Sequence, residues 1–146
     1  MTRREFADLV ERTRAERPRW FDPERPDARA DAAAIEAVER ALGVRLPPDY
    51  VWFLSEYGGG DFVFASIYSA DAGSDLYLPR NQGPPPLPPG HVAFSDDGCG
   101  DLCLFPVRDG AAEDRVLWFD HETDELTADE ADGFLGFVAR DALRPA

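Results

Sequence analysis

Ile35 to Gly60 of this chain spell I-E-A-V-E-R-A-L-G-V-R-L-P-P-D-Y-V-W-F-L-S-E-Y-G-G-G, and this stretch decides the fold. Ile35, Val38 and Leu42 recur at helical spacing and place one apolar stripe on a first helix. Gly43 follows where a helix C-cap adopts the left-handed conformation, which glycine reaches without a Cβ clash. The pattern therefore predicts an amphipathic helix that ends at Leu42.

A second helix is predicted directly after the first. Pro47 and Pro48 lack backbone N–H donors, which the first turn of a helix does not need, so we expect them to open this helix. Asp49 falls in its first turn, where a carboxylate meets the positive end of the helix dipole. Gly58 and the two glycines after it are expected to end the helix. The apolar stripe of this helix consists of Tyr50, Phe53, Leu54 and Tyr57.

Capping patterns predict a helix at each end of the chain. Thr2 and Glu5 have the spacing of a capping box, which predicts an N-terminal helix over residues 2–17. Thr127 and Glu130 have the same spacing and predict the start of a closing helix. Two glycines weaken that helix, so tertiary packing must hold it. Its expected buried stripe is Ala131, Phe134, Leu135, Val138 and Ala142.

The middle of the chain predicts strands, because it is rich in β-branched and aromatic residues between turn signals. The expected strands are residues 62–68, 76–78 (a short edge strand), 91–95, 102–106 and 116–119, and residues 108–114 are expected to form a polar loop. We therefore predict an α+β fold. It is a single domain, residues 1–146, in which N-terminal helices and a C-terminal helix pack against a mainly antiparallel β-sheet.

Two short segments have two interpretations each. Trp20 and Phe21 are either a lid on the core or an exposed aromatic contact, and paired aromatic residues favour the lid. Residues 80–90, RNQGPPPLPPG, cannot make ladder hydrogen bonds at the prolines and predict a loop with polyproline character. This loop is either a stiff surface connection, which we favour, or a ligand for an aromatic groove.

An ordered set of motifs runs along the chain: Leu42–Gly43, Leu46-Pro-Pro-Asp-Tyr50, Phe53–Leu54, Gly58–Gly59, Ala93-Phe-Ser-Asp-Asp-Gly-Cys-Gly-Asp-Leu-Cys-Leu-Phe105, Trp118-Phe-Asp-His-Glu122 and Gly133-Phe-Leu-Gly-Phe-Val138. This set resembles the SUKH superfamily, which includes the yeast cell-wall-assembly regulator domain and many bacterial immunity proteins. The resemblance covers about residues 29–140 and departs from the usual pattern at Tyr57, where the family usually carries Asn. It implies the α+β fold given above.

The charge is strongly acidic and unevenly distributed. The formal net charge is −14, and residues 96–132 contain thirteen acids against two arginines. Such a chain should repel nucleic acid and anionic membranes and attract basic partners, unless the charge is only a solvated face. The expected partner contact is formed by the acidic turns that join the strands, with Asp96, Asp97, Asp120, Glu122 and Asp124. Tyr68 or Trp118 would add an apolar anchor if exposed, but both are expected in the core.

Cysteine usage and the N-terminus indicate a compartment. Cys99 and Cys103 are separated by a span of extended chain that is too long for a disulfide, so free thiols and a reducing cytoplasm are expected. The N-terminus lacks the apolar region of a secretory signal, and no apolar run is long enough to span a membrane. We expect a cytoplasmic monomer.

No metal, cofactor or catalytic site is predicted. The Asp96, Asp97 and Asp101 loop resembles a hard-cation loop but lacks the frame and distal Glu of an EF-hand. A zinc site from His91, Cys99, Cys103 and His121 lacks the usual ligand spacing. Nucleophile-elbow and phosphate-loop motifs are missing from the sequence, which argues against an enzyme.

The resemblance implies an immunity protein that binds and neutralises a cognate bacterial toxin domain without chemistry of its own. The acidic charge favours a basic toxin, such as a nuclease. The alternative is a regulatory interaction module or scaffold of the same superfamily with no toxin partner.

Overall fold

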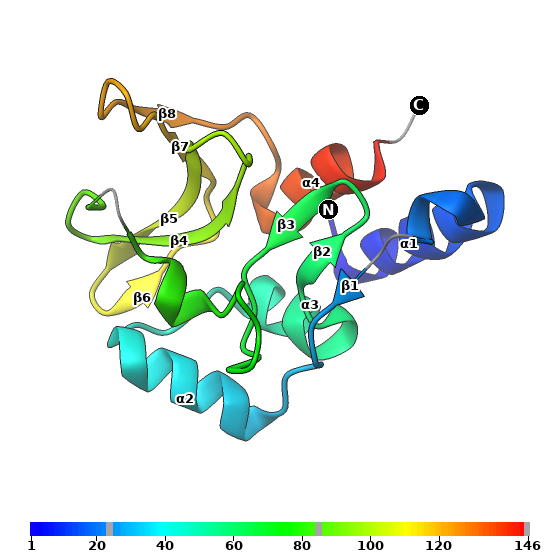
Figure 1. The fold of residues 1–146 in the computed structure, drawn as a ribbon, viewed down its shortest axis with the longest axis horizontal. Coiled ribbons are helices and arrows are strands. Elements are labelled where there is room, and N and C mark those ends of the chain that lie inside the picture. The colour runs from blue at the N-terminus through cyan, green and yellow to red at the C-terminus, as the bar shows by residue number, and fades with distance from the viewer. Residues whose placement is uncertain (23–24, 84–85, 145–146) are drawn as a thin grey trace.

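The computed structural model describes residues 1–22, 25–83 and 86–144. Within them, helices and strands share one buried apolar core (Figure 1). The helical elements are α1 (Arg3–Glu16), a 3₁₀ turn (Pro18–Phe21), α2 (Ala32–Leu42), α3 (Pro48–Tyr57), a 3₁₀ turn (Leu78–Asn81), α4 (Gly133–Val138) and a π-helical turn (Ala139–Leu143). The strands are β1 (Arg25–Pro26), β2 (Gly60–Phe62), β3 (Ala65–Ile67), β4 (His91–Asp96), β5 (Leu102–Arg108), β6 (Ala111–Ala112), β7 (Leu117–Phe119) and β8 (Leu126–Ala128).

The strands form an antiparallel sheet in the order β1-β2-β3-β4-β5-β7-β8, with β6 paired to β5. The pairs Ser66↔Asp96 and Leu102↔Phe119 set the register in the middle of the sheet. This register brings the β2–β3, β4–β5 and β7–β8 turns to the same end of the strands. The predicted α+β fold with an antiparallel sheet is confirmed.

The two helices predicted from residues 35–60 form as expected, because their start and stop signals are local. The Asp31 carboxylate accepts a hydrogen bond from the Ala34 N–H at 2.8 Å and caps α2. Gly43 ends α2 with φ of +67°, and Gly58 ends α3 with φ of +85°. At Gly58 a side chain would also collide with the backbone, since a Cβ would lie 2.1 Å from the Asp27 carbonyl oxygen.

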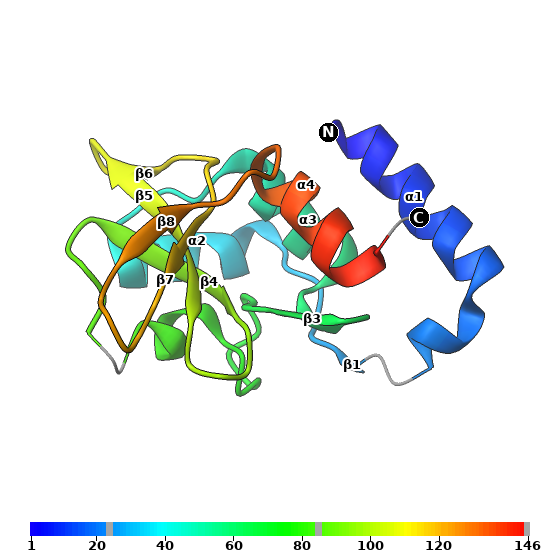
Figure 2. The same cartoon turned by 90° about the horizontal axis from the view of Figure 1, so that it is seen from above.

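The core is a cluster of aromatic rings that joins α3, the sheet and α4. Tyr50 of α3 is fully buried, and its ring centroid lies 4.9 Å from that of Phe134 of α4 and 5.4 Å from that of Phe105 of β5. Phe53 lies 5.3 Å from Phe134 on the same side. Figures 1 and 2 both show α4 between the β7–β8 side of the sheet and α1. The closing helix therefore completes the core that α3 begins.

The single strand predicted over residues 62–68 is wrong. The chain reverses after Phe62, with Val63 at φ of +54°, and forms the β2–β3 hairpin. Pattern alone did not mark the reversal, because Val63 has high β-propensity and rarely adopts positive φ.

The short strand predicted at residues 76–78 is also wrong. Tyr77 makes only an isolated bridge to Ser69, and Leu78 begins a 3₁₀ turn. Pro79 has no N–H for a strand ladder but suits the start of a helical turn. Leu78 is fully buried, so tertiary packing holds the turn.

The predicted start of the closing helix at Thr127 is wrong, and no capping box forms with Glu130. Thr127 lies in β8, opposite Trp118, and α4 starts at Gly133. The amide at the start of α4 is satisfied by a distant residue, because the Phe134 N–H donates to the Asp114 carboxylate at 2.7 Å. The predicted stripe is buried as expected at Phe134, Leu135, Val138 and Ala142, whereas Ala131 is half-buried.

The remaining local predictions have mixed outcomes. The N-terminal capping box of Thr2 and Glu5 is confirmed, and α1 follows it. The polar loop expected at 108–114 contains the short strand β6. Phe21 is buried, as expected for a lid, and Trp20 is half-buried with its ring 4.9 Å from that of Phe64. Part of the proline-rich segment, residues 84–85, lies outside the described residues.

Phe53→Ala tests the aromatic core. Phe53 is fully buried among four aromatic rings, so the variant should lose about 3 kcal/mol or more of unfolding free energy in a urea melt. Phe64→Ala is the matched control, because Phe64 is 46% exposed and should cost about 1 kcal/mol or less. A loss below about 0.5 kcal/mol for Phe53→Ala would contradict the assignment of this helix face.

Candidate partner-binding surface

The two acidic turns predicted as the partner contact lie next to each other. The first segment is Asp96–Asp101, which covers the end of β4 and the β4–β5 turn, and the second is Asp120–Glu125, which forms the β7–β8 turn. We call these two segments together the acidic end of the sheet. The link is β5, which starts opposite the end of β7 in the pair Leu102↔Phe119. Residues separated by about twenty positions in the sequence therefore share one surface.

The five predicted contact acids differ in exposure. Asp97, Glu122 and Asp124 are exposed, whereas Asp96 and Asp120 are half-buried. All five belong to the acidic end of the sheet, as defined above. The sequence thus identified acids that lie together in the structure.

Several of these carboxylates also build the turns. Asp96 accepts hydrogen bonds from the Tyr68 hydroxyl at 2.8 Å and from the Gly98 N–H at 2.9 Å. Asp97 accepts from the N–H groups of Cys99 and Asp101, and Asp120 accepts from that of Glu122 at 2.8 Å. These bonds fix the direction of the carboxylates while leaving their charge near solvent.

A histidine joins the two turns, which the sequence did not reveal. His121 Nδ1 lies 2.7 Å from Asp101 Oδ1 and the His121 N–H donates to the same oxygen at 3.2 Å. Gly100, with φ of +107°, allows the approach, because a Cβ there would lie 2.7 Å from His121 Cε1. The contact raises the pKa of His121 above its ordinary value of 6.5 and lowers the pKa of Asp101 below 3.8.

Asp101, Asp120 and His121 are the residues that could hold a metal ion. One ligand atom from each lies within 4.8 Å of the others, and this is the one such group found among the described residues. This group differs from both metal sites considered from the sequence. It shares Asp101 with the hard-cation loop and His121 with the zinc set, and it adds Asp120. Cys103 is buried, and burial raises the pKa of its thiol far above the ordinary value, so it is a poor ligand and nucleophile.

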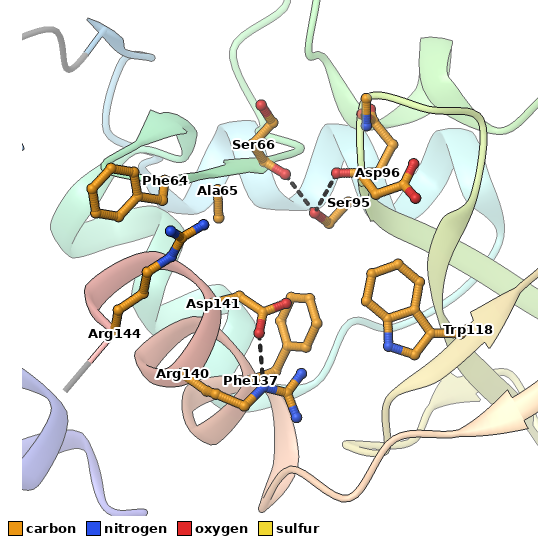
Figure 3. A pocket seen from close by; sticks show the side chains of 12 residues that line it. Phe64, Ala65, Ser66, Ser95, Asp96, Trp118, Phe137, Arg140, Asp141 and Arg144 are labelled. Carbon is orange, nitrogen blue, oxygen red and sulfur yellow. Dashed lines mark hydrogen bonds and ion pairs between the residues drawn. The ribbon is translucent and has the colours of Figure 1, made fainter. Parts of the chain in front are cut away.

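A pocket of about 450 Å³ adjoins the acidic end. Figure 3 shows it between the β2–β3 turn, the end of β4, Trp118 of β7 and the C-terminal helix. Phe64 stands at its rim, with the Arg144 guanidinium 4.4 Å from its ring centroid. Asp96 and Asp97 line its other side. The pocket therefore combines exposed aromatic surface with charges of both signs.

An ion-pair cluster links the residues on this side of the pocket. The Asp129 carboxylate accepts two bonds from the Arg140 guanidinium, both at 2.9 Å, and one from Trp118 Nε1 at 2.8 Å. Arg140 also donates to Asp141 at 2.7 Å. These bonds hold Trp118 half-buried on the pocket wall, whereas Tyr68, the other predicted anchor, is 2% exposed and belongs to the core. Of the two candidates, Trp118 alone reaches the surface.

The cysteines agree with the prediction of free thiols, because Cys99 is exposed and Cys103 is buried without a disulfide. Within the described residues, no helix has the length and apolar character needed to cross a membrane.

An α+β domain with helices on an antiparallel sheet and the ordered motifs of residues 29–140 is the arrangement expected for the SUKH superfamily. The model of the SMI1 / KNR4 family (SUKH-1) matches residues 29–140, and the chain belongs to this family. Comparisons with curated proteins and with solved structures found no significant match.

The His121–Asp101 contact predicts a pH-dependent stability. The contribution of His121 is complete below pH 6.5 and is lost as the pH rises through its raised pKa. The contribution of Asp101 is present above pH 3.8 and is lost as the pH falls through its lowered pKa. His121→Ala should therefore lower the melting temperature more at pH 5.5 than at pH 9. An equal shift at both pH values would contradict the contact, and Asp101→Asn should reproduce the pattern.

The metal prediction remains to be tested. An ion at Asp101, Asp120 and His121 would compete with the hydrogen bonds that these side chains already make. Protein purified without chelator is expected to contain no stoichiometric zinc by elemental analysis, and EDTA should leave its melting temperature unchanged. An increase of several degrees in melting temperature on addition of zinc would identify this cluster as a metal site. The same increase with calcium would identify the Asp96–Asp101 turn as a calcium site.

Proposed function

We propose that this protein is an immunity protein that binds a cognate bacterial toxin domain and neutralises it without catalysis. Family membership supports this class of function. The observation that carries the proposal is the acidic end of the sheet, where two turns rich in carboxylates are joined by the His121–Asp101 contact. A basic toxin, such as a nuclease, is the partner whose charge matches this surface.

Charge favours fast encounter with such a partner. The chain carries a formal net charge of −14, and exposed carboxylates of both acidic turns point to solvent. Opposite charges steer association, and the effect weakens as salt shortens the Debye length from ~10 Å at 0.1 M. The adjoining pocket supplies aromatic surface at Phe64 and Trp118 for short-range contact once the charges have brought the partner close.

The carboxylates are well ordered for this role. Asp96, Asp97 and Asp120 are each held by hydrogen bonds from their own turns. A partner therefore meets charges that are already fixed in place, which reduces the ordering cost of binding. Replacing these residues with Asn removes the charge but keeps an acceptor oxygen, so the turns should survive.

A five-fold neutralised variant tests the proposal. It carries the changes Asp96→Asn, Asp97→Asn, Asp120→Asn, Glu122→Gln and Asp124→Asn. Its association rate with the toxin domain encoded beside it should fall about tenfold or more at low salt, and the dissociation rate should change less. High salt should shrink the difference. The measurement is binding kinetics at two salt concentrations, together with protection of cells on co-expression.

A matched control separates local charge from net charge. The control neutralises five exposed acids on the helices, away from the acidic end: Asp8→Asn, Glu11→Gln, Glu16→Gln, Glu36→Gln and Glu56→Gln. Both variants lose the same five charges, so only the position differs. If both associate equally fast with the toxin, the acidic end is merely a solvated face. If the wild type does not bind the toxin domain encoded beside it, the result favours the alternative function, a regulatory interaction module with no toxin partner.

A further inference from the structure

The alternation of hydrogen-bonded pairs between β7 and β8 determines which backbone N–H and C=O groups of β8 point away from β7. The Asp120 N–H donates to the Glu125 carbonyl at 3.0 Å, and the Asp129 N–H donates to the Val116 carbonyl at 2.9 Å. Hydrogen-bonded pairs alternate along an antiparallel ladder, so Trp118 and Thr127, which lie between these two, form the next such pair. Leu126 and Ala128 therefore turn their N–H and C=O groups away from β7.

These outward groups are open. In the sheet order β8 is the last strand beyond β7, and Figure 1 shows it along the outer edge of the sheet. Leu126, Thr127 and Ala128 are all exposed, and the Leu126 side chain is an exposed apolar group at 41%. Among the described residues, no group makes a hydrogen bond to the outward N–H or C=O of Leu126 or Ala128. Two donors and two acceptors thus stand at the spacing of a strand ladder.

Hydrogen bonds hold the residue that follows β8 in place before anything binds to the strand. Asp129, directly after the strand, is held by Arg140 and Trp118 Nε1, and its carboxylate also accepts from the Ala131 N–H at 2.7 Å. Preorganisation of this kind lowers the entropy cost of adding a strand. Natural proteins protect an exposed edge with charged side chains, proline, a bulge or a very short strand. β8 is short, at three residues, but Leu126, Thr127 and Ala128 include no charged residue and no proline.

The charge around β8 favours a basic binding partner over a second copy of this chain. Glu122, Asp124 and Glu125 precede the strand and Glu130 follows it, all four exposed, whereas Asp129 is already neutralised by Arg140. A second copy of this chain would bring the same carboxylates against them, and each copy carries a net charge of −14. Like charges along a shared edge oppose that pairing, whereas an extended segment rich in lysine or arginine would be attracted.

We infer that β8 is the edge to which the toxin partner adds a basic, extended segment as a further strand of the sheet. The inference rests on the proposed function and names the part of the surface that gives binding its geometry. Backbone hydrogen bonds from Leu126 and Ala128 set the register, and the surrounding acids receive the basic side chains. Leu126 supplies the apolar contact that the added strand covers.

Proline substitution at β8 tests the inference with an inactivated form of the toxin domain encoded beside this chain as the probe. Leu126→Pro removes an outward N–H without removing a bond to β7. It should weaken binding roughly tenfold, mainly through faster dissociation, as expected for a lost backbone bond and an obstructed ladder. Leu126→Ile keeps both the N–H and an apolar side chain, so it is the side-chain control and should stay within about threefold of wild type. Ala128→Pro is the second variant and should behave like Leu126→Pro.

Amide hydrogen exchange of the wild-type complex gives a second readout that needs no substitution. The Leu126 and Ala128 amides should exchange at least tenfold more slowly when the toxin is bound. Toxin binding with unchanged exchange at both amides, or with unchanged affinity in both proline variants, overturns the added strand and leaves the proposed function standing. If the wild-type chain does not bind the toxin, both the added strand and the proposed function are wrong. A dimer of this chain that Leu126→Pro abolishes would assign β8 to a second copy and overturn the basic occupant.

Discussion

The packing of the buried Tyr50 side chain between the sheet and α4 is the interaction on which the rest of the structure depends. It lies among Phe94 and Phe105 of the sheet and Phe134 of α4, and its hydroxyl donates to the Tyr68 carbonyl at 2.7 Å. A buried hydroxyl left without a partner is costly, so this bond favours the observed docking position of α3 over others. That position fixes where α4 closes the core, and α4 in turn forms one wall of the pocket beside the acidic end.

The proposed binding surface follows from the register of the sheet. Because β5 lies between β4 and β7 and is antiparallel to both, the turns that follow β4 and β7 meet at one end of the sheet, and their carboxylates accumulate there. Such crowding would be unfavourable if the acids only repelled one another. Backbone N–H groups, the Tyr68 hydroxyl and His121 each donate to a carboxylate and offset part of that cost. The same bonds hold the charges in place for a partner.

Sequence reasoning succeeded where the deciding signals are local and failed where they are distant. Gly43 and the prolines before Tyr50 act on their own helices, so α2 and α3 could be predicted. Thr127 lies in a strand because Trp118 pairs with it across the hairpin, which no capping pattern could show. In the same way, the acid-rich turns could be predicted because their residues are contiguous in the sequence. The His121–Asp101 contact joins residues 20 positions apart and depends on the sheet register.

Protection of Cys99 tests the central claim, that the acidic end of the sheet binds the partner, most directly. Cys99 is an exposed thiol within the β4–β5 turn, whereas Cys103 is buried and its raised pKa makes it unreactive. Alkylation of the wild-type chain therefore reports on this turn without any substitution. The account predicts that saturating toxin slows the alkylation of Cys99 about tenfold or more. Alkylation of Cys99 at the same rate in the free chain and in the complex would contradict it.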